Sequence, residues 1–190
     1  MVPRIVREGR LETLARAGRF VALEPIPGLD VASAFALAAR THADGATRLV
    51  VAAGISLMKA MHAAHRAGHA IGPVSPALLR MRPSFTPAGR PHASIIALPA
   101  AGPLDSDVLP GIIDLYPDGS DARLRAQLDA PYRRTIASDL VSLGVLLAWL
   151  QEIGESGSVP LHELATALRD GRIARVQEAA VRLKEILGGA

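Results

Sequence analysis

The pattern of apolar residues changes its period in the first half of the chain. Residues 49–53 are apolar without interruption, Gly54 follows, and Leu57, Met61 and Ala64 then recur at helical spacing. An apolar run with no polar alternation predicts a strand covered on both faces, and such strands are typical of α/β folds. We therefore expect a buried strand that ends at a Gly54 corner and is followed by a helix.

A strand and a helix are predicted just before this corner. Residues 20–26 read as a first strand, and Asp30 is a suitable N-cap for a helix over residues 31–42. Because the helix is long enough for a right-handed crossover, the two strands would be parallel neighbours. The Gly54 corner would then lie where α/β sheets bind ligands, with Ser56 near a helix N-terminus that attracts anions; a plain turn is the alternative.

The rest of the chain turns from strands to helices. Residues 93–98 and 111–116 predict two more strands, and residues 120–129 and 131–153 predict two helices. The second of these helices is apolar nearly all round, so it should pack in the interior or against another subunit. We expect a homodimer through this helix, centred on Leu146. Its core or contact residues are Leu140, Leu143, Leu146, Leu147, Trp149 and Leu150.

The predicted fold class is therefore α/β: about four strands in a mixed or parallel sheet with covering helices, followed by a helical C-terminal region. The expected divisions are an N-terminal basic helix over residues 1–18, the α/β domain over residues 19–119 and the helical region over residues 120–190.

Composition limits the chemistry. The chain is 49% hydrophobic but only 3% aromatic, so its core must be mainly aliphatic. It has no cysteine, which excludes disulfides, thiolate catalysis and cysteine-ligated metals. Its net charge of +3 permits an anionic partner without requiring one. The N-terminus lacks a continuous apolar core, and the apolar stretch 140–150 is shorter than the ~20 residues of a membrane span. We expect a cytoplasmic protein with no membrane partner.

Basic residues gather in a proline-rich loop over residues 72–91. Arg80, Arg82 and Arg90 surround Phe85 there, an arrangement that suits a phosphate or nucleic-acid backbone beside one stacking ring. A solvated surface loop is the alternative. The N-terminal helix is also rich in arginine, but glutamates are interleaved, which is typical of an ordinary solvated face.

Three histidines suggest a second, different chemistry. His62, His65 and His69 would fall within roughly 60° of one another on the helix after Gly54, with Met58 beside them. Imidazoles at this spacing can converge on zinc, copper or nickel, completed by His92 or by an acid near Asp105. Ordinary surface histidines are the alternative.

The acids of the middle region have two interpretations. Asp105 and Asp107 form a close pair that suits acid–base work or turn capping. Asp114 interrupts an apolar segment and is either exposed or a buried functional acid. Catalytic residues therefore stay unassigned, and the sequence leaves open whether the protein is an enzyme.

The C-terminal segment, residues 158–187, carries two amphipathic faces separated by Gly171. One face consists of Leu161, Leu164, Ala165 and Leu168, and the other of Ile173, Val176, Ala180, Leu183 and Leu187. This segment resembles the helix-turn-helix core of bacterial winged-helix regulators. The resemblance implies that residues 172–187 enter the DNA major groove, with Arg172, Arg175 and Arg182 at the interface. A plain helical hairpin, with Glu178 and Arg182 as a surface pair, is the alternative.

The leading hypothesis is a non-enzymatic regulatory or assembly protein that binds nucleic acid and needs no cofactor. It rests on the helix-turn-helix resemblance, the basic pI and the loop arginines. The alternative is a metal-dependent enzyme or metal-binding protein that uses the three histidines.

Overall fold

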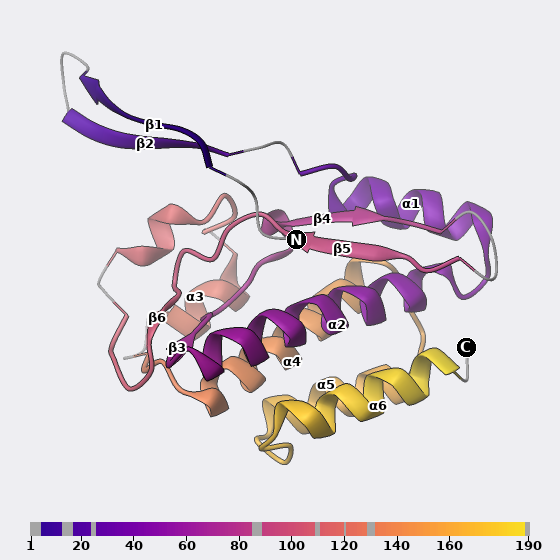
Figure 1. Cartoon of the computed structure of the whole chain (residues 1–190). Helices are drawn as coiled ribbons and strands as arrows, with labels where there is room; N and C mark the ends of the chain where they lie inside the picture. Colours follow the sequence, from indigo (N-terminus) through magenta and orange to yellow (C-terminus); the bar gives the residue numbers. More distant parts are fainter. Residues whose placement is uncertain are drawn as a thin grey trace.

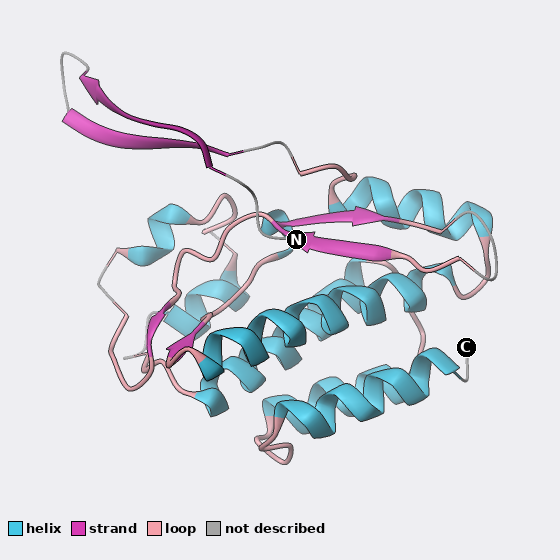
Figure 2. Ribbon diagram, viewed as in Figure 1, coloured by secondary structure: helices cyan, strands magenta, loops and turns pink. Residues whose placement is uncertain are grey.

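The computed structural model describes residues 5–12, 17–23, 26–84, 89–108, 111–119, 121–128 and 132–188, and for residues 5–23 it describes the backbone. Helices dominate these residues, and the strands form three separate antiparallel pairs (Figures 1 and 2). The predicted four-stranded mixed or parallel sheet is therefore wrong. The helices are α1 (Val31–Thr41), α2 (Gly45–Arg66), α3 (Ala122–Leu128), α4 (Ile136–Ile153), α5 (Val159–Arg169) and α6 (Val176–Gly188).

The long helix α2 is the centre of the molecule. It packs against α1, α4 and α6 and against the strand β5 (His92–Ile95). The predicted strand at residues 49–53 is part of this helix, and Leu49, Val50 and Val51 are completely buried in it. A helix covered on several sides is apolar all round, and apolar periodicity alone cannot distinguish it from a buried strand.

Gly54 is not a corner between a strand and a helix. It lies within α2 at the crossing with α6, where an added Cβ would stand 2.7 Å from Leu183 Cδ1. Ser56 is likewise inside the helix, so the predicted anion site at a helix N-terminus is not formed there. The glycine lets two helices approach closely.

The strands are short apart from one hairpin. β1 (Ile5–Glu12) pairs with β2 (Ala17–Leu23), so the predicted basic helix over residues 1–18 is wrong for the described part of that segment. β3 (His69–Ala70) pairs with β6 (Gly102–Pro103), and β4 (Leu79–Arg82) pairs with β5. The predicted strand at residues 111–116 is mostly a 3-10 helix, Ile112–Leu115. Figure 1 shows the β1–β2 hairpin extending away from the body.

The predictions for the other helices are closer to the structure. α1 begins after Asp30, whose Oδ1 accepts a hydrogen bond from the Ser33 backbone N–H at 2.9 Å, as expected of an N-cap. These bonds, from the amide and the hydroxyl of Ser33, lower the pKa of Asp30. α5 and α6 are separated by a turn that contains Gly171, with φ +68°. Periodicity and capping therefore located these helices correctly.

Helix α4 is a core helix of a single chain. By length and composition it could cross a membrane, but more than half of it is buried inside the protein. It packs closely against α5 and also against α2, so its leucines are already covered. The buried residues are Leu140, Leu143, Leu146, Leu147, Trp149 and Leu150. The apolar face that motivated a homodimer centred on Leu146 is thus occupied within one chain.

One buried cluster joins the two halves of the chain. It includes Phe35 and Leu57 from α1 and α2, together with Leu147 and Leu183 from α4 and α6. Packing is therefore continuous across residue 119, where the sequence suggested that one region ends and the next begins.

Candidate functional site

The arginines of the α5–α6 segment are largely balanced by neighbouring acids. Arg172 Nη2 lies 3.0 Å from Asp170 Oδ2, and Arg182 Nη2 lies 2.9 Å from Glu178 Oε1. The Glu178–Arg182 surface pair is as the helical-hairpin alternative predicts. Arg175 is exposed. Since α6 also packs Leu183 onto α2 at Gly54, one face of this helix is committed to the core.

A groove lies between α5, α6 and the start of α2. It has a volume of about 570 Å³. Its residues are Asp44, Thr47, Ser158, Pro160, Glu163, Leu164, Arg182, Glu185 and Ile186. Glu163 and Glu185 have no cationic partner within 4.0 Å in the described part of the chain. The groove is acidic, which opposes a phosphate backbone at the α5–α6 segment.

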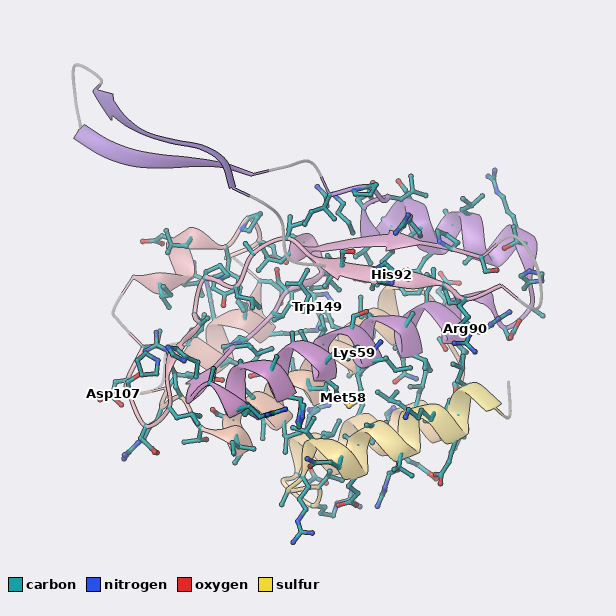
Figure 3. All side chains as sticks on the ribbon, viewed as in Figure 1. Met58, Lys59, Arg90, His92, Asp107 and Trp149 are labelled. Atoms are coloured by element: carbon teal, nitrogen blue, oxygen red, sulfur yellow. The ribbon has the colours of Figure 1, made fainter. Side chains whose placement is uncertain are left out.

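A second charged surface lies over β4, β5 and the middle of α2. Along β4 the side chains alternate, with Leu79 and Met81 buried and Arg80 and Arg82 on the opposite face. Arg82 is directly opposite His92 in the antiparallel register. We call Lys59, Arg82, Arg90 and His92 the basic face; Figure 3 labels Lys59 on α2 and His92 and Arg90 on or beside β5.

Two cations of the basic face, Arg82 and Lys59, act electrostatically on His92. Burial lowers the pKa of His92, and the positive charges of Arg82 and Lys59 lower it further. His92 Nε2 also lies 3.2 Å from Ser94 Oγ. Just before β5, Arg48 from α2 donates from Nη2 to the Gly89 carbonyl at 2.6 Å and so holds the segment that carries Arg90.

The loop arginines proposed from sequence therefore have different surroundings. Arg82 and Arg90 are exposed, whereas Arg80 is partly buried and donates from Nη1 to the Leu79 carbonyl at 3.1 Å. Phe85 lies outside the described residues. The structure brings Arg82 together with His92 and Lys59. Sequence patterns alone do not indicate that α2 supplies a cation to this surface.

The three histidines do not form the expected cluster. His62 and His65 are on α2, but the helix ends at Arg66 and His69 lies beyond it on β3. His69 Nδ1 donates to the Ala67 carbonyl at 2.8 Å. Among the described residues no three histidine, aspartate or glutamate side chains gather as a metal site would require. Of the other residues expected near this cluster, His92 is on β5 and Met58 is buried.

His65 instead belongs to a buried polar network that sequence reasoning missed. Its Nε2 donates to Asp139 Oδ2 at 2.8 Å, and the Asp139 side chain is fully buried at the start of α4. The same carboxylate accepts hydrogen bonds from the Ile71 and Gly72 backbone N–H groups at 3.0 and 2.9 Å. Asp139 could have been noticed in the sequence, because an acid within an apolar helix is seldom buried without hydrogen-bonding partners.

A second buried charge, Arg134, orders the segment that contains the predicted acid pair. It donates to the carbonyls of Ala100 and Asp107 at 2.7 and 2.6 Å and to Ser106 Oγ at 3.0 Å. Asp105 is exposed with φ +62°, in a turn. The segment that contains Asp105 and Asp107 is therefore a turn whose backbone is held by Arg134. Asp114, the other acid singled out from the sequence, is exposed.

The structure thus contains two kinds of polar cluster, one buried and one exposed. The His65–Asp139 and Arg134 networks are internal and hold chain segments together, whereas the basic face points outward and can bind anions. No protein-family model matches the chain, and no curated protein matches it either.

Proposed function

We propose that the protein is a non-enzymatic regulatory or assembly protein that binds nucleic acid through the basic face. One observation carries this proposal. Lys59, Arg82 and Arg90 have no carboxylate within ion-pair distance in the described part of the chain, whereas Arg172 and Arg182 are each paired. Cations that already neutralise an acid gain less from a phosphate than cations that face only water.

The arrangement favours a polymer over a single small anion. The three cations come from α2, from β4 and from the segment before β5, and they are spread over a surface. An extended phosphate backbone can contact all three and release condensed counterions at each contact. With no base-reading element proposed at this surface, binding should depend weakly on base sequence.

This proposal moves the contact away from the α5–α6 segment. The acidic groove and the ion pairs that Arg172 and Arg182 already form with neighbouring acids both oppose phosphate there. The three arginines of the predicted recognition helix segment, Arg172, Arg175 and Arg182, are therefore not part of the proposed contact surface.

Two matched variants test the proposal by fluorescence anisotropy with labelled mixed-sequence duplex over a range of salt concentrations. The first carries Lys59→Gln, Arg82→Gln and Arg90→Gln. The second carries Arg172→Gln, Arg175→Gln and Arg182→Gln, which removes the same net charge. We expect the first variant to reduce the slope of log K against log salt by about 2 to 3, at about 0.9 per phosphate contact, and the second to leave it nearly unchanged.

Absence of binding by the parent protein at low salt would end the nucleic-acid proposal. Loss of binding only in the second variant would instead favour the helix-turn-helix reading. The metal alternative has no supporting cluster in the described residues, and elemental analysis of the untagged protein for stoichiometric zinc, copper or nickel decides it directly.

A further inference from the structure

His92 is the member of the basic face whose charge changes near neutral pH. Lys59, Arg82 and Arg90 stay cationic up to about pH 10, whereas an imidazole changes charge between about pH 5 and 8. His92 is exposed on β5 and stands directly opposite Arg82 in the antiparallel register with β4. The number of cations on the basic face therefore depends on the pH.

The elements that pack against β5 bring only positive charge to His92. These elements are α2 and β4, and the sequences of α2, β4 and β5 contain no aspartate or glutamate. Lys59 from α2 and Arg82 from β4 act on His92 as positive charges. His92 also has no carboxylate within 4.0 Å in the described part of the chain. A proton on His92 thus adds a charge that no neighbouring acid of these elements neutralises.

Ser94 holds one side of the His92 ring. His92 Nε2 lies 3.2 Å from Ser94 Oγ, and Ser94 is buried. A protonated imidazole donates from both ring nitrogens, so Nδ1–H can donate to a phosphate oxygen while Nε2–H donates to Ser94. A neutral ring has one N–H and no charge. Protonation therefore gives His92 both a charge and a donor that suit a phosphate.

We propose that acid pH strengthens nucleic-acid binding at the basic face through protonation of His92. This inference rests on the proposed function and adds regulation to the same surface. A phosphate beside His92 favours the charged imidazole, so binding takes up a proton. Affinity then rises as the pH falls, because the protein enters the complex with its fourth cation already formed.

The surroundings of His92 determine the pH range of the effect. Burial lowers the pKa of His92 below the ordinary 6.5, and the charges of Arg82 and Lys59 lower it further. A bound phosphate raises this pKa again. The extra affinity is therefore complete below the pKa of the free protein and is lost as the pH rises through the pKa of the complex.

Fluorescence anisotropy of the full-length protein tests the inference with labelled mixed-sequence duplex, in buffer with EDTA, at about pH 5.5 and about pH 7.5. We expect the affinity of the parent to be about five- to tenfold higher at the lower pH, which corresponds to a pKa increase of up to about one unit on binding. The slope of log K against log salt should steepen by up to about 0.9. His92→Gln should lose both changes. His92→Arg, with a permanent cation, should bind at the higher pH nearly as tightly as the parent binds at the lower pH.

Two other histidines provide matched controls. His162 is exposed on α5, which carries no member of the basic face, and His62 is exposed on α2 three residues after Lys59. His162→Gln and His62→Gln should both keep the full pH dependence. A pH dependence that survives His92→Gln, or that disappears in either control, would overturn the inference.

The same experiment separates this inference from the proposed function. Binding that is weakened by removal of the three permanent cations but is equal at both pH values would overturn the regulation and leave the proposed function standing. No binding by the parent at either pH would end both.

Proton NMR provides a readout that does not depend on affinity. The Cε1–H resonance of His92, assigned by its loss in His92→Gln, shifts as the ring is protonated. Its midpoint should lie at a higher pH with saturating duplex than without it, and the midpoint of His162 should stay the same. Equal midpoints for His92 with and without duplex would contradict the inference, because proton uptake on binding requires them to differ.

Discussion

Asp139 joins three parts of the chain that are distant in sequence. Its carboxylate lies at the start of α4 and binds His65 at the end of α2 and the backbone of Ile71 and Gly72 after β3. Gly72 must be glycine there, because its φ is +71° and an added Cβ would lie 2.6 Å from the Ala100 Cβ. One buried charge therefore fixes a backbone turn that only glycine can form.

Replacing Asp139 with Asn tests this role. The amide keeps the size of the side chain but removes the charge and places an NH2 group among donors, so we expect a loss of about 3 kcal/mol in the free energy of unfolding. Urea denaturation measures it. Asp170→Asn, on an exposed acid, should change stability by less than about 0.5 kcal/mol. A loss below about 1 kcal/mol at Asp139 would mean that its three bonds contribute little.

The two tyrosines of the chain should respond together to alkaline pH. Burial raises the pKa of both Tyr116 and Tyr132, and the Tyr116 hydroxyl also donates to the Pro73 carbonyl at 2.6 Å. In the unfolded chain both ionise near pH 10. The folded state then holds more protons than the unfolded state above that pH, so stability is complete below pH 10 and falls as the pH rises beyond it.

We expect Tyr116 alone to contribute up to about 1.4 kcal/mol of this loss per pH unit. Tyr116→Phe should make the alkaline decline shallower while costing about 1 kcal/mol at neutral pH for the lost hydrogen bond. Tyrosinate absorbance should appear only with unfolding. Tyrosinate that forms near pH 10 in protein that is still folded would contradict this.

At the scale of elements, the contact between α4 and α5 depends on a residue without a side chain. An added Cβ at Gly144 would lie 2.7 Å from the Ala165 carbonyl oxygen and 2.8 Å from the Leu168 Cβ. Gly144→Ala should therefore destabilise the protein by about 1 to 2 kcal/mol, because overpacking against backbone exceeds the helix propensity that alanine adds.

Gly188→Ala is the matched control for this contact. Gly188 is the last residue of α6, and an added Cβ there meets nothing within 4 Å. Its effect on thermal unfolding should be neutral or slightly stabilising. Similar destabilisation at both glycines would show that the α4–α5 contact can relax.

Local signals predicted some elements well, and tertiary burial hid others. The Asp30 cap, the α1 periodicity and the Gly171 turn each depend on neighbouring residues alone, and the structure has all three. The strand prediction for residues 49–53 is wrong because the burial of this run comes from helices far away in the sequence. The candidate arginines could be named from composition, but only the fold shows which cations meet acids and that Lys59 joins Arg82.

At the scale of the whole molecule, packing across residue 119 predicts a single unfolding transition. The buried cluster draws on both α2 and α4, so neither region keeps its core without the other. Trp149 is buried on α4, where the Arg123 guanidinium lies 5.2 Å from its ring centre, and its fluorescence reports on that region. Fluorescence and far-UV circular dichroism should change together in denaturant. Two separated transitions would indicate two independent folding units.

The crossing of α2 and α6 at Gly54 and Leu183 has a consequence for the making of the protein. These residues are about 130 positions apart, so at ~5–20 residues per second the ribosome adds Leu183 roughly 6 to 26 seconds after Gly54. During that interval the face of α2 that α6 will cover is exposed to water. The nascent chain therefore carries an apolar surface suited to a chaperone until α6 has been made.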